Sequence, residues 1–366
     1  MRVCWAGSFD PAFGRNRRLA EYLEEMSVEY FVVRVEIWPD DRVTGFTRGR
    51  ARTLIRMLLR YPLLLFRLII APRPDLYLVS YPGWVDVPVV KAVAVLKRRP
   101  VVFDMFISLH DTAVLDRELV AEAAPLARLA LMLDRVSIRL SNRVIADTWA
   151  HARFFAEIAD VDPTRFGVVF LGADEEVFHP VDVETEDPGL VIFYGTSVPL
   201  QGMGTILSAA HLLLEDGIRF KIVGEDAAAW SREIGDDQLH NVEFVGRLPQ
   251  QELPLEMARA AVCLGIFGAS SKADRVVPHK VYEAMACARP VVTGRSKAIL
   301  ETIGTDAVAV CDRADPQDLA KVLRRLLADH REREQLGRTG RVLFQSKFSR
   351  VPQAARLLKE LKAVNS

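Results

Sequence analysis

Residues 278–293 read PHKVYEAMACARPVVT, and their order predicts a loop, a short helix and a buried strand. Pro278 suits the N-terminus of a helix, where its missing N–H costs nothing. Pro290 ends the helix, and the VVT run that follows it is β-branched and short, as is typical of an inner parallel strand. The stretch therefore predicts one helix–strand step of an α/β domain.

Lys280 and Glu283 fall one turn apart at the start of this predicted helix. Backbone N–H groups are exposed at a helix N-terminus and carry a positive partial charge. A cation, a carboxylate and these N–H groups together predict a site for a ligand that has both phosphate and hydroxyl groups.

The same alternation of short apolar runs and helical patterns extends over the whole chain. Runs such as PVVFDMFIS and NRVIADT precede an acidic, apolar-poor segment at 182–189, and LVIFYG and FKIVGE follow it. Alternation of this kind predicts βαβ units and parallel sheets. We therefore expect an α/β protein of two Rossmann-like domains, 1–181 and 190–345, joined by a linker, with ligands at the C-terminal strand ends facing a cleft.

The composition fits two ordinary globular domains. The chain has 366 residues, of which 50% are hydrophobic and 26% charged, and its formal net charge is zero. A neutral balance gives no general attraction to nucleic acid, so no such partner is expected. The four cysteines have no metal-like spacing and predict reduced core thiols in a cytoplasmic protein, and the N-terminus predicts a strand rather than a signal peptide.

One stretch is strongly basic. Between Arg42 and Arg73 there are eight arginines and no acidic residue, interleaved with apolar residues. Arginines at 56, 60 and 67 exclude an ordinary membrane-spanning helix, because a charge at the bilayer centre costs several kcal/mol. Two alternatives remain, namely an amphipathic helix on an anionic membrane surface, which would make the protein peripheral on the cytoplasmic membrane face, and a core helix of the first domain.

Glycines follow several predicted strands directly, and glycine there lets the backbone approach a ligand closely. They are Gly7, Gly195, Gly224, Gly246 and Gly268. Their spread over both halves predicts a bound nucleotide. The chain lacks a G-x-G-x-x-G after its first strand and a G-x-x-x-x-G-K-[ST] motif, which argues against nicotinamide dehydrogenases and P-loop proteins.

Two loops of the first half carry polar residues suited to chemistry. Gly14 and Arg15 open the first helix, where backbone N–H groups and a guanidinium can clamp a diphosphate, or where the arginine is merely solvated. Asp104, His110 and Asp111 lie at or just beyond a buried strand. A histidine beside carboxylates can act as a general base, or it can simply be a polar residue of the surface.

Several longer motifs carry a resemblance that covers nearly the whole chain. They are VIFYGTSVPLQGMGTILSAAHLLL, FKIVGE, NVEFVGRLP, KADRVVPHKVYEAMACARPVVTG, SNRVIADTWAHARFF, VVFLGADEEVFHP and FSRVPQAARLLKELK. Together they resemble the retaining GT-B glycosyltransferases of group 1 (family 4). The resemblance implies the GT-B fold, with a C-terminal helix in 346–366 that crosses back to the N-terminal domain.

The resemblance also implies roles for individual residues. Glu283 matches the second Glu of a Glu-x7-Glu motif that binds the ribose of a nucleotide sugar, and two vicinal hydroxyls suit a carboxylate. His110 matches an active-site histidine near the donor sugar, and Gly14 matches a glycine loop near its phosphates. Gly246 and Arg247 are expected to frame the base.

Two departures from the family pattern concern the leaving diphosphate. Arg275 stands where the first Glu of the motif is expected, and Thr196 and Gln201 stand where the family carries an Arg and a Lys. Developing diphosphate charge must be stabilised by cations or a metal. Lys272, Arg275 and Lys280 are the predicted replacements, and because no Asp-x-Asp motif is present we expect neither a metal nor another cofactor.

The predicted function is therefore that of a retaining hexosyltransferase. It would use a UDP-, GDP-, TDP- or ADP-linked sugar and an acceptor hydroxyl held by the first domain, on a lipid-linked or cell-surface glycan acceptor. The alternatives are a catalytically silent GT-B partner subunit, which would not bind a donor, and a GT-B epimerase or phosphorylase, which would use water or phosphate instead of an acceptor alcohol.

Overall fold

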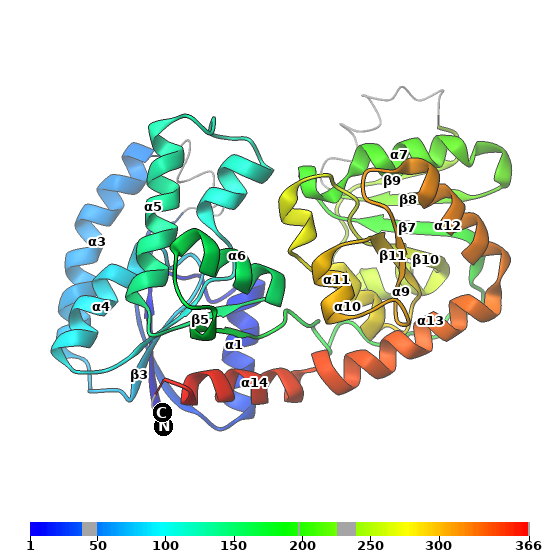
Figure 1. The fold of residues 1–366 in the computed structure, drawn as a ribbon. Coiled ribbons are helices and arrows are strands. Elements are labelled where there is room, and N and C mark those ends of the chain that lie inside the picture. Colours follow the sequence, from blue (N-terminus) through cyan, green and yellow to red (C-terminus); the bar gives the residue numbers. More distant parts are fainter. Residues whose placement is uncertain (39–49, 197, 225–238, 365–366) are drawn as a thin grey trace. The chain divides into compact units, whose positions relative to one another are not determined.

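The computed structural model describes residues 1–38, 50–196, 198–224 and 239–364. They form two compact units (Figure 1). Unit 1 comprises Met1–Leu171 and Arg350–Ser366, and unit 2 comprises Gly172–Ser349. Each unit is built on a parallel six-stranded sheet, as the alternation of apolar runs predicts.

The sheet of unit 1 has the order β2-β1-β3-β4-β5-β6. Its strands are β1 (Arg2–Gly7), β2 (Glu29–Arg34), β3 (Leu76–Val79), β4 (Val101–Asp104), β5 (Arg143–Ala146) and β6 (Phe166–Val168). Its α-helices are α1 (Gly14–Glu25), α3 (Arg50–Ile70), α4 (Asp86–Leu96), α5 (Pro125–Leu140), α6 (Trp149–Ala159) and α14 (Arg350–Lys362), and a π-helical segment spans Asp111–Asp116.

One face of this sheet is covered by α1 together with the C-terminal helix α14. Leu19 and Leu23 of α1 share a buried core with Leu357 and Leu361 of α14 and with alternate residues of the strands. The helices α3, α4 and α5 follow one another as packing neighbours elsewhere on the unit. The chain thus returns from unit 2 to complete the core of unit 1.

The sheet of unit 2 has the order β12-β11-β10-β7-β8-β9. Its strands are β7 (Asp187–Tyr194), β8 (Arg219–Val223), β9 (Val242–Val245), β10 (Ala260–Leu264), β11 (Val291–Gly294) and β12 (Ala309–Cys311). Its α-helices are α7 (Met203–Leu212), α9 (Leu253–Arg259), α10 (His279–Ala286), α11 (Lys297–Thr302), α12 (Pro316–Ala328) and α13 (His330–Leu343). Helices α7 and α12 share one buried core with β7, β8 and β10.

The stretch at 278–293 folds as its sequence predicts. Pro278 is the N-cap of α10, and β11 begins directly after Pro290. All four residues of β11 are buried, as expected for β-branched residues in an inner parallel strand.

The predicted linker at 182–189 lies after the observed boundary between the two units. Unit 1 ends at Leu171, and the last residues of the expected linker, 187–189, begin strand β7. Pro188 is tolerated there because pairing with β8 starts only at Leu190, so its missing N–H breaks no bond on that side.

Candidate functional site

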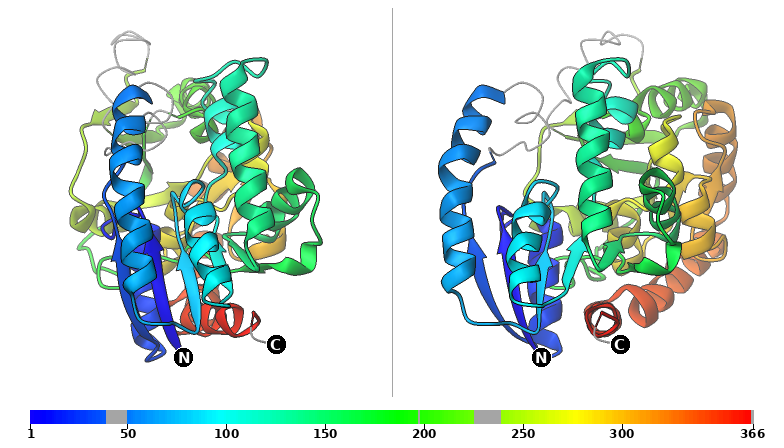
Figure 2. Two further views of the ribbon diagram at one scale, coloured as in Figure 1. Left: turned by 90° about the vertical axis from the view of Figure 1, so that its left-hand side faces the viewer. Right: turned by 60° about the vertical axis from the view of Figure 1, so that its left-hand side comes forward.

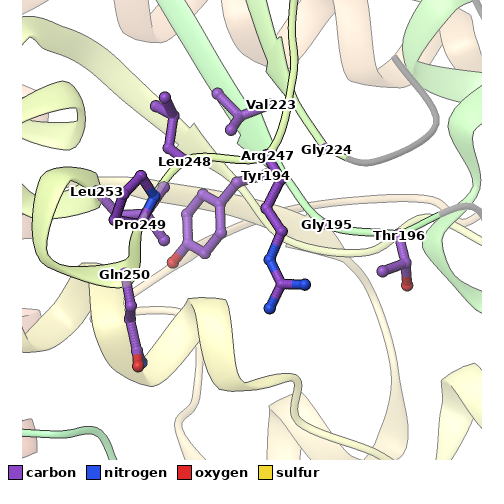
Figure 3. A pocket seen from close by; sticks show the side chains of 10 residues that line it. All are labelled: Tyr194, Gly195, Thr196, Val223, Gly224, Arg247, Leu248, Pro249, Gln250 and Leu253. Atoms are coloured by element: carbon purple, nitrogen blue, oxygen red, sulfur yellow. The ribbon is translucent and has the colours of Figure 1, made fainter. Parts of the chain in front are cut away.

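Unit 2 has a pocket at the C-terminal ends of three neighbouring strands, β7, β8 and β9. Its volume is about 390 Å³. It is lined by Tyr194, Gly195, Thr196, Val223, Gly224, Arg247, Leu248, Pro249, Gln250 and Leu253 (Figure 3). Ligands of doubly wound sheets bind at this end of the strands.

Four of the lining residues were predicted from sequence, namely Gly195, Thr196, Gly224 and Arg247. The predicted Gly246 lies directly before Arg247 and is exposed. Figure 3 shows Arg247 reaching into the space bordered by Tyr194, Gly195 and Thr196. The pocket therefore combines glycine backbone with a guanidinium, which suits a ligand that is both anionic and close to the main chain.

Tyr194 connects this pocket to Glu283. Its hydroxyl donates a 2.7 Å hydrogen bond to Oε2 of Glu283, and burial and the carboxylate charge raise the pKa of Tyr194 well above its usual value. The tyrosine therefore stays protonated and orients the carboxylate. Sequence reasoning missed Tyr194, although a buried tyrosine at a strand end needs a partner for its hydroxyl.

Lys280 reaches the loop that follows β7. Its Nζ donates a 2.6 Å hydrogen bond to Oε1 of Gln201 and lies 3.8 Å from the centre of the Phe193 ring. A Cβ placed on Gly195 would come within 3.0 Å of this amine, so the glycine leaves room for it. Burial lowers the pKa of Lys280 to about 7, against the opposing effect of Glu283. The ammonium thus lies at the loop from which the family's Arg and Lys are missing.

The loop before α10 is held by polar contacts within unit 2. Arg313 donates to the carbonyl of Ser270, and Asp274 accepts from the backbone N–H of Lys297. Lys272 in this loop is buried, and Arg275 is 3.3 Å from the hydroxyl of Ser271. Neither cation lines the pocket of unit 2, so their predicted contacts with a diphosphate remain predictions.

Two of the five strand-end glycines have structural reasons of their own. A Cβ on Gly268 would meet the backbone oxygens of Pro199 and Leu200 at 2.4 and 2.6 Å. Gly7 has φ +137°, and a Cβ there would come within 2.6 Å of Asp86. Close packing within each unit therefore accounts for both glycines, and their contact with a ligand stays a prediction.

The structure corrects the predicted roles of Arg15 and Asp104. The guanidinium of Arg15 donates to both carboxylate oxygens of Asp104, at 2.6 and 3.0 Å, and to the carbonyls of Val169 and Phe170. Both side chains are fully buried. Arg15 therefore joins α1 to β4 and to the end of β6 inside unit 1, and it does not present its charge to a phosphate.

His110 lies just before the π-helical segment and is half-buried. Burial lowers its pKa below the usual value. Its backbone N–H donates to Asp134, which also accepts from the N–H of Leu109 and the hydroxyl of Ser108. Burial raises the pKa of Asp134 to about 7. Sequence reasoning missed the role of Asp134. The feature that could have indicated it is the position of an aspartate on the buried face of α5.

Asp111 is buried next to a second histidine. Its Oδ2 lies 4.0 Å from Nε2 of His151, whose Nδ1 is 2.5 Å from Oδ1 of Asp147. Asp111 and His151 therefore belong to an internal acid–histidine group of unit 1. His110 is more exposed than either of them, so a ligand could reach it more easily.

Gly14 is the first residue of α1, and a Cβ added there would meet nothing within 4 Å. We therefore expect Gly14→Ala to keep or slightly raise the midpoint of thermal unfolding, since alanine is favoured in helices by about 1 kcal/mol. If a ligand approaches this backbone, the same change lowers the rate of sugar transfer at least about tenfold, because the methyl group occupies its space. Thermal scans and transfer assays check both parts, and an unchanged rate removes Gly14 from the site.

Residues 188–329, within unit 2, match the family model described as glycosyl transferases group 1. This part of the chain belongs to the group 1 glycosyltransferases. The match includes the pocket, Lys280 and Glu283, and it confirms the family predicted from the motifs.

Curated relatives of the chain include an MMP alpha-(1->4)-mannosyltransferase of Mycolicibacterium hassiacum, 27% identical over 65% of this chain and 60% of the relative. A D-inositol 3-phosphate glycosyltransferase of Thermobifida fusca is 31% identical over 56% of this chain and 51% of the relative. The matches therefore span about half to three-fifths of these relatives.

Solved structures resemble the whole chain. HepE of Anabaena in complex with UDP has a TM-score of 0.68 at 15% identity and covers 99% of this chain and 100% of that one. A sucrose-phosphate synthase of Thermosynechococcus elongatus has a TM-score of 0.72 at 17% identity, with 99% and 98% covered. These likenesses confirm the predicted GT-B fold.

Proposed function

We propose that this protein transfers a sugar from a nucleotide diphosphate sugar, held in the pocket of unit 2, to an acceptor hydroxyl held by unit 1. The observation that carries the proposal is the pair of contacts at the start of α10, where Lys280 meets the loop after β7 and Glu283 meets Tyr194. A cation beside glycine backbone suits a diphosphate, and an oriented carboxylate suits the vicinal hydroxyls of a ribose. That HepE was solved with UDP and with UDP-glucose supports the same class of donor.

The proposed reaction retains the anomeric configuration. The bond between the anomeric carbon and the diphosphate oxygen breaks, the acceptor oxygen attaches from the same face, and its proton passes to an oxygen of the leaving diphosphate. The protein then mainly positions the two substrates and stabilises the negative charge that develops on the diphosphate. We propose that lysines rather than a metal ion supply this stabilisation, and transfer that persists in excess EDTA checks this point.

Donor binding tests the proposal directly. We expect one series among UDP, GDP, TDP and ADP nucleotides and their sugars to raise the thermal midpoint, since a ligand at 100 times its Kd adds about 2.7 kcal/mol to stability. Glu283→Ala should weaken binding of that nucleotide about 100-fold, because two charge-assisted hydrogen bonds are lost.

The matched control is Glu215→Ala, an exposed carboxylate of the same unit outside the pocket, which should bind like wild type. If no nucleotide series shifts the midpoint, the donor site is absent and the silent-partner alternative replaces the proposal. That alternative is motivated by Thr196 and Gln201, which leave the pocket loop without its family cations. A lipid-linked or cell-surface glycan acceptor remains our proposal for the second substrate.

A further inference from the structure

Helix α3 of unit 1 exposes apolar side chains along most of its outer surface. Leu58 is 67% exposed, Leu59 70%, Phe66 58% and Ile70 64%. These values are far above those of a helix that packs its apolar side inward. In the left view of Figure 2, α3 (blue) lies at the front of unit 1, and in the right view it stands at the outer edge of that unit. The apolar face is thus presented outward by the fold of the unit.

A narrow strip of α3 packs into the core of unit 1. Leu64 and Leu68 are fully buried, and Tyr61 donates a 2.9 Å hydrogen bond to Asp86 at the start of α4. This strip accounts for a core-facing role of α3, which was one of the two alternatives from sequence. It leaves the larger apolar surface unexplained.

Three arginines of α3, at 56, 60 and 67, share one flank of the helix, between the strip and the outer face. Arg56, Arg60 and Arg67 are spaced i, i+4 and i+11, which places them on one side of an α-helix. Arg67 donates to the carbonyl of Arg34 at 2.9 Å, so this flank runs beside the end of β2. The helix therefore has an apolar outer face bordered by a row of positive charge.

The apolar face continues onto the end of α4. Val95 and Leu96 are 64% and 72% exposed, and the neighbouring Lys97 donates to the carbonyls of Leu68 and Ala71, at the end of α3. This contact places the two helix ends side by side. Residues 97–99 read KRR, so basic side chains also border the patch at this end. The α3 face is our name for the exposed apolar side chains of both helices, namely Leu54, Ile55, Leu58, Leu59, Leu65, Phe66, Ile69, Ile70, Val95 and Leu96.

We propose that the α3 face is a docking surface for a membrane that contains anionic lipids. Apolar side chains would enter the boundary between headgroups and acyl chains, and the arginine row would contact lipid phosphates. The 42–73 stretch offers no acidic residue to oppose them. A second copy of the chain fits less well, since the same face on a partner would bring like charges together.

The helix would lie on the surface rather than cross it. No helix in the described part of the chain is long and apolar enough to span a bilayer. At about 1.5 Å per residue, α3 is roughly 30 Å long, and this length would lie along the membrane plane. The inference is independent of sugar transfer, because vesicle binding is measured without a donor.

Vesicle flotation with the full-length chain tests the proposal. We expect wild type to float with phosphatidylcholine vesicles that contain one-third phosphatidylglycerol, and to bind phosphatidylcholine alone at least about fivefold more weakly. The triple variant Leu58→Gln, Leu59→Gln, Phe66→Gln should lose at least about tenfold in partition, because its apolar surface no longer enters the lipid. Arg60→Gln should lose about fivefold.

Matched controls lie in unit 2. The triple variant Leu212→Gln, Leu300→Gln, Val342→Gln changes exposed apolar side chains, and Arg331→Gln changes an exposed arginine. Both should bind vesicles like wild type, and unchanged thermal midpoints confirm that all variants fold. The proposal is overturned if wild type does not float, if the α3 triple variant floats equally well, or if the unit 2 triple variant loses as much. It is also overturned if sedimentation shows a wild-type dimer that the α3 variant dissociates.

Discussion

We expect Lys280→Met to lower kcat/KM for sugar transfer by about a thousandfold, and to change binding of the nucleoside monophosphate by less than about threefold. Removal of a group that stabilises developing charge costs up to this much, and the leaving diphosphate develops its charge only as the glycosidic bond breaks. The monophosphate lacks that charge, so it depends mainly on Glu283 and the pocket backbone. Methionine keeps the length of the buried side chain next to Phe193 and Gln201.

Lys297→Met is the matched control, because this exposed lysine of the same unit pairs with the loop carboxylate of Asp274 and lies outside the pocket lining. It should transfer sugar at the wild-type rate. Transfer by Lys280→Met within tenfold of wild type contradicts the role of Lys280, and the test then moves to Lys272→Met.

The pH dependence of diphosphate affinity gives an independent measurement of the same role. Burial holds the pKa of Lys280 at about 7 in the free protein. The diphosphate favours the protonated amine, so below pH 7 the charge is already present, and above pH 7 binding must take up a proton. Affinity should therefore fall by about tenfold per pH unit above neutrality, and calorimetry of Lys280→Met should show no such slope.

The second large effect is expected for Arg15→Met, which should lower the free energy of unfolding of unit 1. The change leaves Asp104 buried without its cation and the carbonyls of Val169 and Phe170 without their donor. Breaking a buried ion pair on one side costs about 3–5 kcal/mol. For a unit of this size the thermal midpoint should fall by about 10 °C.

The double variant Arg15→Met, Asp104→Leu separates a structural pair from a phosphate ligand. An apolar pair replaces a buried ion pair at little cost, so the double variant should recover most of the lost stability and keep nucleotide affinity. Arg17→Met, on the exposed side of the same helix, serves as the control. A stable Arg15→Met protein that no longer binds nucleotide would restore Arg15 to the ligand site.

Local sequence determined the elements of this fold. Pro278 marks the start of α10, and Pro290 with the VVT run marks the start of β11, since proline and β-branched residues act on the backbone within a few positions. Alternating apolar runs gave the two parallel sheets, and glycine after a strand identified Gly195 and Gly224 at the pocket. Motifs of this kind were also sufficient to identify the family.

Tertiary structure decided what each polar residue contacts. Lys280 meets Gln201, Glu283 meets Tyr194, and Arg15 meets Asp104, although the members of each pair are far apart in the chain. Such pairs depend on which strand ends become neighbours in the sheet and on how deeply each side chain is buried. The same sequence pattern, an arginine at a helix start, can therefore give a ligand contact or an internal ion pair, and burial in the folded unit distinguishes the two because an unpaired buried charge is too costly to keep.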